Sequence, residues 1–449
     1  MLSVAATAIF AQSKDDTKGA ITPEMMTRLQ ASFKNEPADK AIRNALGAYD
    51  ANKLALNQEN LEDFDTEFSI RVKSKGITDQ KKSGRCWLFT GLNVLRAKAI
   101  ARHDMKEFQF SQAYIFFYDQ LEKANMFLQM IIDTRKEDMT SQTVDWLFMN
   151  PINDGGTFTG VADLVNKYGL VPSSAMHESY SANNTSRMNT FLKLKLRQGG
   201  VQIREMADKK ATEAQLMAKK EEIMKDVYRI LALSIGVPPT EFTFEGKKYT
   251  PMEFAAEYGN SEICNDYIML MNDPTREYYK VYEIDRDRHT YEGHNWLYVN
   301  LPIEEIKEMA IASLKDSTAM YFSCDVAKFL NSERGLLDEN NYDYNSLMGM
   351  SFDMDKRQRV ATHASGSSHA MTLVAVDIKE DKPVKWMVEN SWGASSGYKG
   401  HLIMTDSWFN EYMFRLVVNR KYATPKALEC LKTKPIKLPS WDPMFAPED

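Results

Sequence analysis

The sequence predicts an α+β fold that combines helices with an antiparallel strand pair. Three stretches support this prediction: an apolar run that begins at Cys86, two β-branched runs near residues 369–377 and 385–390, and a run rich in Ala, Leu, Met, Lys and Glu over residues 212–235. The first and the last are helical in character, and the two β-branched runs have the alternation of strands. We therefore expect helices and an antiparallel strand pair in one chain.

Cys86 is the first candidate for chemistry. It begins the apolar helical run, where the positive end of the helix dipole favours a thiolate, and a thiolate is a nucleophile. Gln80 precedes it by six residues and offers an amide N–H that can help to hold an oxyanion. Because a free cysteine is more often a small buried apolar residue, the assignment depends on finding a base and a group that orients this base.

A base and an orienting group occur at the two predicted strands. His369 stands at the entry of the first strand, and Asn390 ends the second. An antiparallel pair brings the start of one strand beside the end of the other, so these side chains are expected to be neighbours. The asparagine carbonyl would then accept one imidazole N–H while the other ring nitrogen faces the thiol. The rival His363 lies in the same loop but no alternating strand follows it.

These residues resemble the papain superfamily of cysteine peptidases, in particular its bleomycin hydrolase and aminopeptidase C branch. The resemblance rests on Gln80, on Ser83-Gly84-Arg85-Cys86-Trp87-Leu88-Phe89, on His369 and on Glu389-Asn390-Ser391-Trp392-Gly393, and it extends from about Phe68 to the C-terminus. An arginine before the nucleophile is typical of this branch. The resemblance implies a papain-like fold with a helical left half that carries the nucleophile helix, an antiparallel β right half, and additional helical insertions.

The resemblance also implies a role for each site residue. Cys86 is the nucleophile, and His369 is the general base and later the acid. Asn390 orients His369, and Trp392 shields their contact from water. Gln80 and the backbone N–H of Cys86 donate to the oxyanion. The implied reaction is hydrolysis of N-terminal peptide bonds through an acyl-enzyme, with no cofactor and no metal.

Asp154, Gly155 and Gly156 form a further match to the family. A glycine pair is usually a turn, but in papain-like enzymes it lines the non-primed side of the cleft. The missing side chains let the substrate backbone come close. The next four residues, Thr-Phe-Thr-Gly over 157–160, depart from the Gln-Trp-Asp-Met usual in the family, which leaves the side-chain preference of the cleft open.

The catalytic halves lie far apart in the chain. Cys86 and His369 are separated by about twice the ~130–150 residues usual for papain-type enzymes. We therefore expect a catalytic domain over residues 21–437 with a helical insertion at about 180–290. In relatives such helices make oligomer contacts, and the resemblance implies a homohexamer.

The N-terminal residues 1–20 carry a separate expectation. Their apolar stretch and a possible cut after Ala11 resemble a secretory signal that lacks a basic leader. Such a signal would export the protein to the periplasm or beyond the cell. Without it, the protein is expected in the cytoplasm.

The C-terminal residues 438–449 are expected to form an arm that reaches toward the cleft, since Pro439, Pro443 and Pro447 keep it extended. In aminopeptidase C relatives such an arm lies in the cleft, and its terminal carboxylate captures the α-amine of the substrate. This implies a substrate-binding role for Asp449. The last five residues, 445–449, depart from the family's usual Gly-Ala-Leu-Ala.

Composition limits the class of partner. The chain is 43% apolar and 26% charged, as in soluble globular proteins, and has no run near the ~20 apolar residues of a membrane span. Its formal charge of −6 argues against a nucleic-acid surface. The family resemblance implies that the substrates are peptides with a free N-terminal amine.

Two alternatives remain open. The altered arm favours an endopeptidase or a mixed-mode peptidase, which would cleave N-terminally blocked peptides. A ring that binds peptide or nucleic acid with vestigial activity would instead shift single-stranded DNA.

Overall fold

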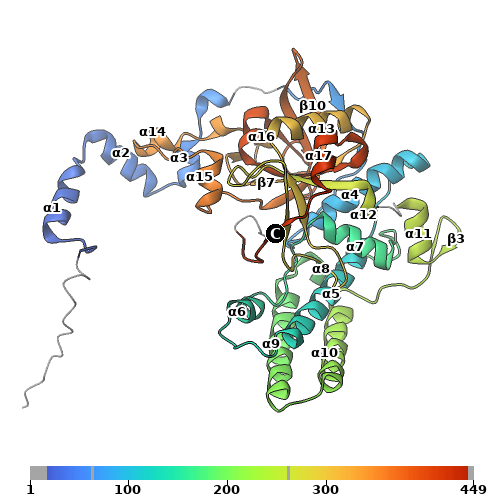
Figure 1. Cartoon of the computed structure of the whole chain (residues 1–449). Coiled ribbons are helices and arrows are strands. Elements are labelled where there is room, and N and C mark those ends of the chain that lie inside the picture. The colour runs from blue at the N-terminus through green and yellow to red at the C-terminus, as the bar shows by residue number, and fades with distance from the viewer. Residues whose placement is uncertain (1–17, 62–64, 260–262, 443–449) are drawn as a thin grey trace, which may run out of the picture. The chain divides into compact units, whose positions relative to one another are not determined.

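The structure is a computed structural model that describes residues 18–61, 65–259 and 263–442 (Figure 1). The chain forms two compact units: one comprises the residues up to Gln58 together with 342–352, and the other comprises the remainder. Gln80, Cys86, His369 and Asn390 all belong to the second unit.

The first unit is helical. Its helices are α1 (Pro23–Ser32), α2 (Pro37–Leu46), α3 (Ala51–Ala55) and α14 (Tyr344–Met348). Thr22 caps α1 by accepting the Met25 N–H, and a proline at the first helical position follows it, where its missing N–H costs nothing. Tyr344 donates its hydroxyl to Asn52 at 2.8 Å and so joins α14 to α3.

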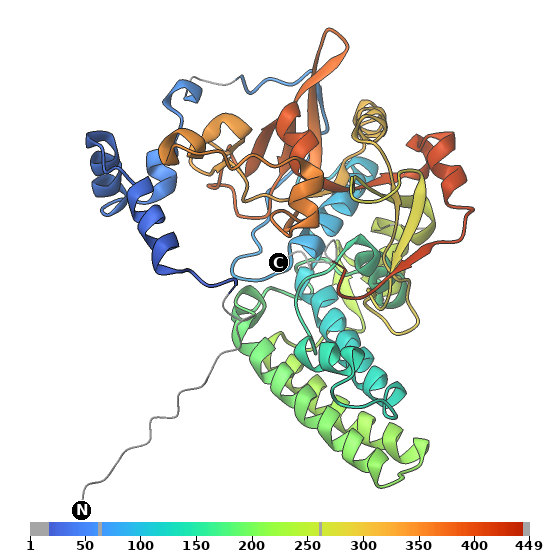
Figure 2. The same cartoon turned by 60° about the vertical axis from the view of Figure 1, so that its left-hand side comes forward.

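The helical half of the second unit contains the predicted nucleophile helix and the helical part of the predicted insertion. Its helices are α4 (Cys86–His103), α5 (Gln112–Asp133), α6 (Gln142–Met149), α7 (Phe158–Tyr168), α8 (Tyr180–Asn183), α9 (Ser186–Asp208), α10 (Glu213–Ser234), α11 (Pro251–Tyr258) and α12 (Ile263–Asp266). The long helices α9 and α10 lie side by side and pack on α5 (Figures 1 and 2).

Two helix predictions are confirmed. Helix α4 begins at Cys86, and α10 fills the stretch predicted over 212–235. Thr212 and Gln215 form a capping box at the start of α10, which satisfies two N–H groups that the helix cannot bond itself. The helical character of the insertion ends at α12, and the residues after it join the sheet.

A twelve-stranded sheet forms the other half. Its strands are β1 (Ile70–Arg71), β4 (Tyr267–Met271), β5 (Lys280–Ile284), β6 (Leu297–Asn300), β7 (Met320–Cys324), β8 (Leu330–Asn331), β9 (Leu336–Leu337), β10 (His369–Lys379), β11 (Lys382–Glu389), β12 (His401–Thr405), β13 (Met413–Asn419) and β14 (Ile436–Leu438). The order is β14-β5-β6-β4-β13-β7-β10-β11-β12-β9-β8, with β1 beside β10. A separate hairpin joins β2 (Phe242–Phe244) to β3 (Lys247–Tyr249).

The predicted antiparallel strand pair is confirmed as β10 and β11. Thr372 faces Glu389 and Leu373 faces Val388, so the start of β10 lies beside the end of β11. The sheet is not antiparallel throughout, because β4 with β6, β5 with β14 and β9 with β12 run parallel.

Helices also accompany the sheet. They are α13 (Ile303–Lys315), α15 (Lys356–Ala361), α16 (Asp406–Tyr412), α17 (Pro425–Cys430) and the short 3-10 turns η1 (Gln58–Asn60), η2 (Glu339–Asn341) and η3 (Arg420–Tyr422). Strand β10 is buried over its first nine residues, since α13 and α4 both pack against it. Helix α4 thus lies in the core with 14 of its residues buried.

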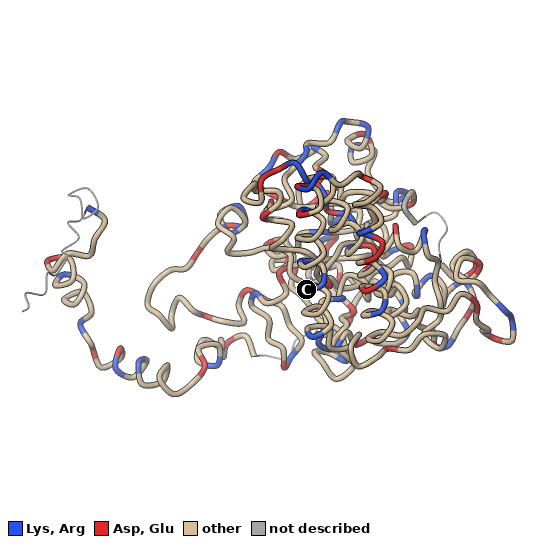
Figure 3. Tube along the Cα trace, turned by 90° about the horizontal axis from the view of Figure 1, so that it is seen from below, with Lys and Arg blue, Asp and Glu red and all other residues tan. Residues whose placement is uncertain are grey.

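Among the described residues, no helix combines the length and the apolar character that crossing a membrane requires. Basic and acidic positions are interspersed along the tube in Figure 3, in keeping with the formal charge of −6.

Candidate active site

Cys86 is the first residue of α4, and its side chain is fully buried. Arg85 before it has φ −100° and ψ 19°, so the helix starts at the cysteine itself. The sulfur therefore lies at the positive end of an 18-residue helix, which favours the thiolate. Helix α4 packs against β10, and Cys86 shares one apolar core with Ala370, the residue after His369. The thiol helix and the histidine strand therefore meet.

His369 begins β10 and is held by Asn390, as predicted. Its Nε2 lies 2.8 Å from Asn390 Oδ1. The same oxygen accepts the backbone N–H of Ser391 at 2.8 Å, so the amide oxygen faces two donors. His369 Nε2 then carries the proton, which leaves Nδ1 as the basic nitrogen. The Trp392 ring stacks on the imidazole with centroids 4.8 Å apart, so it covers this contact.

Gln80 is buried and held at both ends of its amide. Ser391 Oγ donates to its Oε1 at 2.6 Å, and its Nε2 donates to the Ser83 carbonyl at 2.7 Å. These two bonds fix which way the amide points. Because an amide nitrogen carries two hydrogens, one N–H remains available for an oxyanion after the bond to Ser83.

Asp154 is predicted to bind substrate, but in the structure its carboxylate bonds other groups of the protein. It accepts the Gly84 N–H at 2.9 Å and bonds the side chains of Thr185 and Asn189. Its carbonyl accepts the Trp87 indole N–H at 2.7 Å. Asp154 thereby fastens the glycine pair to the loop before Cys86.

Gly155 and Gly156 lie on a buried support that sequence reasoning missed. A Cβ on Gly156 would come within 2.3 Å of the His289 ring and 2.7 Å of Trp87, so only glycine fits there. The Gly155 carbonyl accepts from Lys123 Nζ at 2.6 Å. His289 Nδ1 lies 2.5 Å from Asp119, and Lys123 lies 3.0 Å from the same carboxylate.

In this support, Lys123 influences the protonation of both His289 and Asp119. Burial, reinforced by the nearby Lys123 ammonium, lowers the pKa of His289 and keeps the ring neutral at pH 7. Burial opposes ionisation of Asp119, but Lys123 and His289 outweigh it and lower the pKa of that carboxyl. No local motif surrounds His289 in the sequence, and the pairing depends on residues 170 positions apart.

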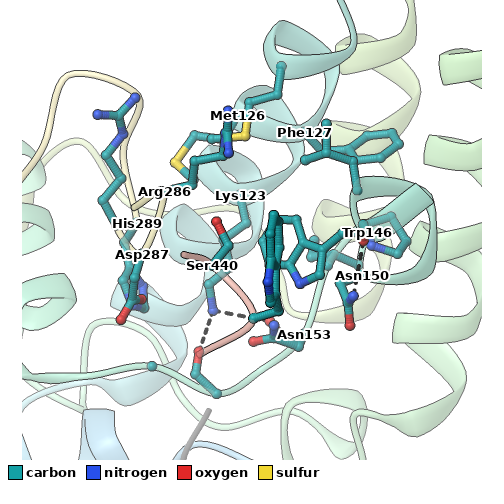
Figure 4. A pocket seen from close by; sticks show the side chains of 18 of the residues that line it. Lys123, Met126, Phe127, Trp146, Asn150, Asn153, Arg286, Asp287, His289 and Ser440 are labelled. Atoms are coloured by element: carbon teal, nitrogen blue, oxygen red, sulfur yellow. Dashed lines mark hydrogen bonds between the residues drawn. The ribbon is translucent and has the colours of Figure 1, made fainter. Parts of the chain in front are cut away.

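A cavity of about 230 Å³ adjoins the glycine pair (Figure 4). Helices α5 and α6 give it an apolar wall, and residues 286–289 line another part of it. Trp441, from the C-terminal arm, also lines this cavity. Lys123 reaches the Asn153 and Gly155 carbonyls at its edge (Figure 4).

The arm is anchored as far as Asp442. Strand β14 pairs with β5, Ser440 Oγ donates to the Asp285 carbonyl at 2.7 Å, and Arg276 bridges Asp442 to Asp273. Asp449, the predicted amine-binding residue, lies outside the described residues. Within the described ranges, no group of three or more His, Cys, Asp or Glu side chains is arranged to hold a metal ion.

Comparison with known proteins places the chain in a family. Residues 20–445 match the model of the peptidase C1-like family. Human bleomycin hydrolase is 37% identical, covering 96% of this chain and 99% of its own, and aminopeptidase C of Lactobacillus delbrueckii subsp. lactis is 33% identical over 93% and 96%. The crystal structure of PepW from Lactobacillus rhamnosis HN001 matches with a TM-score of 0.91 at 33% identity, over 96% of this chain and 99% of that one.

Proposed function

Since the chain belongs to the peptidase C1-like family, we propose that Cys86 and His369 hydrolyse peptide bonds through an acyl-enzyme. The fold is the papain-like α+β fold that the sequence predicts. The activity is that of a cysteine aminopeptidase, in line with relatives named bleomycin hydrolase, aminopeptidase C and aminopeptidase E.

One observation carries the assignment of roles. The His369–Asn390 hydrogen bond of 2.8 Å lies under Trp392, on the strand that packs against the helix begun by Cys86. The thiolate attacks the peptide carbonyl carbon, and the C–N bond breaks as His369 gives a proton to the leaving amine. Water, deprotonated by His369, then attacks the thioester, which releases the acid and restores the thiolate.

The oxyanion of each tetrahedral intermediate is held by Gln80 Nε2–H and the backbone N–H of Cys86. The Gln80 amide is already oriented by Ser391 and Ser83, so little reorganisation is needed as charge develops. Asp154, Gly155, Gly156 and Trp392 form the adjoining substrate-binding surface. Fixed backbone at Gly155 and Gly156 supports pairing with an extended peptide.

The C-terminal arm, residues 438–449, selects substrates with a free N-terminal amine. Trp441 lines the cavity that Gly155 and Gly156 also line, which supports an arm that reaches the non-primed side. A terminal carboxylate there, at Asp449, would attract an α-ammonium group and block longer N-terminal extensions. We also propose that the protein assembles into a homohexamer. A monomeric mass measured by light scattering would contradict this assembly.

The test compares a free-amine aminoacyl fluorogenic substrate with its N-acetylated twin. We expect the intact chain to cleave only the free-amine form, and a variant lacking residues 445–449 to gain activity on the blocked form. Cys86→Ala serves as the control and should abolish turnover of both. Cleavage of both substrates by the intact chain would favour the endopeptidase alternative. The unusual sequence of residues 445–449 motivates that alternative.

A further inference from the structure

The loop between Gln80 and Cys86 is held by an ion pair between the buried Arg85 and the partly exposed Glu178. Arg85 is completely buried, and its two terminal nitrogens reach the Glu178 carboxylate at 3.1 and 2.8 Å. The rings of Phe89 and Phe116 each lie 5.1 Å from its guanidinium carbon. Two parallel hydrogen bonds and two aromatic faces leave a planar guanidinium little freedom to move.

Ser83 links this ion pair to Gln80. Arg85 Nε donates to Ser83 Oγ at 2.9 Å, and Ser83 Oγ donates to the Gln80 carbonyl at 2.6 Å. The Gln80 side chain bonds back to the Ser83 carbonyl at 2.7 Å. Glu178, Arg85, Ser83 and Gln80 therefore form one continuous set of hydrogen bonds that ends at the proposed oxyanion donor.

The stretch of chain that begins at Glu178 also holds the loop between Gln80 and Cys86 at a second point. The Lys82 N–H donates to the Asn183 carbonyl at 3.0 Å. Asp154 accepts the Gly84 N–H and is itself held by Thr185 and Asn189. Glu178, Asn183, Thr185 and Asn189 all lie within residues 178–189, near the predicted start of the helical insertion at about residue 180.

We infer that Arg85 and Glu178 are positioning residues for the oxyanion donor Gln80, and that the start of the insertion, residues 178–189, sets the geometry of the catalytic loop. Catalytic groups must be held within about 0.5 Å of their productive position, and a misplacement of about 1 Å can cost about 10²-fold in rate. This inference rests on the proposed role of Gln80 and adds the structure that fixes it.

The experiment measures kcat and KM of four single variants on the free-amine substrate. Gln80→Ala should lower kcat about 10²–10³-fold, the usual loss for one oxyanion donor. Arg85→Met should lower it by up to about 10²-fold, and Ser83→Ala and Glu178→Gln by about 5- to 50-fold, with KM changed less than about threefold. Lys81→Gln is the matched control, since its exposed side chain pairs with Asp79 in the same loop.

A second readout separates positioning from general damage. Alkylation of Cys86 by iodoacetamide needs the thiolate but forms no oxyanion, so its rate and pH profile should stay unchanged in all four variants. In a Gln80→Ala background, Ser83→Ala should have almost no further effect on kcat, because both changes act through one group.

The outcomes are distinct. Unchanged kcat in Ser83→Ala and Glu178→Gln overturns the inference, even if Arg85→Met does not fold. Alkylation that slows in step with kcat also overturns it, because Arg85 would then act on the thiolate. If Gln80→Ala itself keeps full kcat, the proposed oxyanion role fails, and the inference fails with it.

Discussion

Asn390 holds His369 through a single oxygen. Its Oδ1 accepts both His369 Nε2–H and the Ser391 N–H, while its Nδ2 finds no partner among the described residues. The orientation of the imidazole therefore depends on the amide oxygen, and the Trp392 ring adds a covering surface rather than a polar contact.

Asn390→Ala should lower kcat about 10- to 100-fold while KM changes little. Acid–base catalysis typically contributes about 10²–10⁴-fold, and an imidazole that loses its orienting acceptor gives up part of this. Steady-state kinetics on the free-amine substrate would measure the loss. A large rise in KM at constant kcat would instead assign Asn390 to substrate binding.

Lys356 is a buried cation outside the site. Its Nζ donates to Asn272 Oδ1 and to the carbonyls of Asn410 and Met413 at 2.8, 3.1 and 2.6 Å. Burial lowers the pKa of Lys356 to about 7. Above that pH the unfolded chain retains a proton that the folded chain has lost, so the free energy of unfolding rises with pH until about the ordinary lysine value.

Comparison with Lys356→Met isolates this effect, because other titrating groups are shared by both proteins. Relative to the variant, the wild type should gain about 2 kcal/mol of stability between pH 7 and pH 9. Urea unfolding at the two pH values measures it. A difference independent of pH would mean that the folded protein keeps Lys356 charged throughout this range.

Two elements that carry catalytic residues are joined by a buried ion pair. Arg96 on α4 donates to Glu389, the last residue of β11, at 2.5 Å, and also reaches the Gly76 carbonyl at 3.1 Å. Both charged side chains are at most 3% exposed. Cys86 begins α4 and Asn390 follows β11, so this pair ties the nucleophile helix to the strand end that orients His369.

Glu389→Gln should therefore lower the free energy of unfolding by about 3–5 kcal/mol, because it leaves Arg96 buried without its counter-charge. The double variant Arg96→Met with Glu389→Met should recover much of the loss. Glu221→Gln, whose partner Lys225 is about as exposed as it is, should change stability by less than about 0.5 kcal/mol. Urea unfolding checks all three, and equal losses in Glu389→Gln and Glu221→Gln would contradict the argument.

Local sequence patterns predicted the elements whose own residues show a strand-like alternation or a helix-forming composition. The β-branched alternation predicted β10 and β11, and a composition rich in Ala, Leu, Met, Lys and Glu predicted α10. The neighbourhood of His369 and Asn390 followed from strand geometry alone, because antiparallel pairing fixes which ends meet.

Long-range partners could not be predicted in the same way. Strand β7 lies between β13 and β10, and His289 supports Gly156. Both contacts join segments far apart in the sequence, and the local periodicity of a segment does not indicate its partner. Arg85 and Glu178 are similar: an arginine before the cysteine matched a family pattern, but its partner 93 residues away had no sequence signal.

At the scale of the whole molecule, the proposed role of the arm is to restrict the site to chain ends. It is held by β14, by Ser440 and by the Arg276–Asp442 pair, of which Arg276 also holds the fully buried Asp273. Since Asp442 is the last described residue before the terminal seven, this ion pair is the final anchor that the described structure gives the arm.

Asp442→Asn should therefore weaken the selection for free amines without removing it. Loss of a charge-assisted bond of about 1.5 kcal/mol would raise the undocked fraction of the arm about tenfold. The ratio of N-acetylated to free-amine turnover should rise accordingly, but less than after removal of residues 445–449. Glu429→Gln, which affects an exposed pair with Lys432 just before β14, is the control and should leave the ratio unchanged. If truncation raises the ratio and Asp442→Asn does not, β14 and Ser440 suffice as the anchor; if neither change raises it, the arm does not gate the cleft.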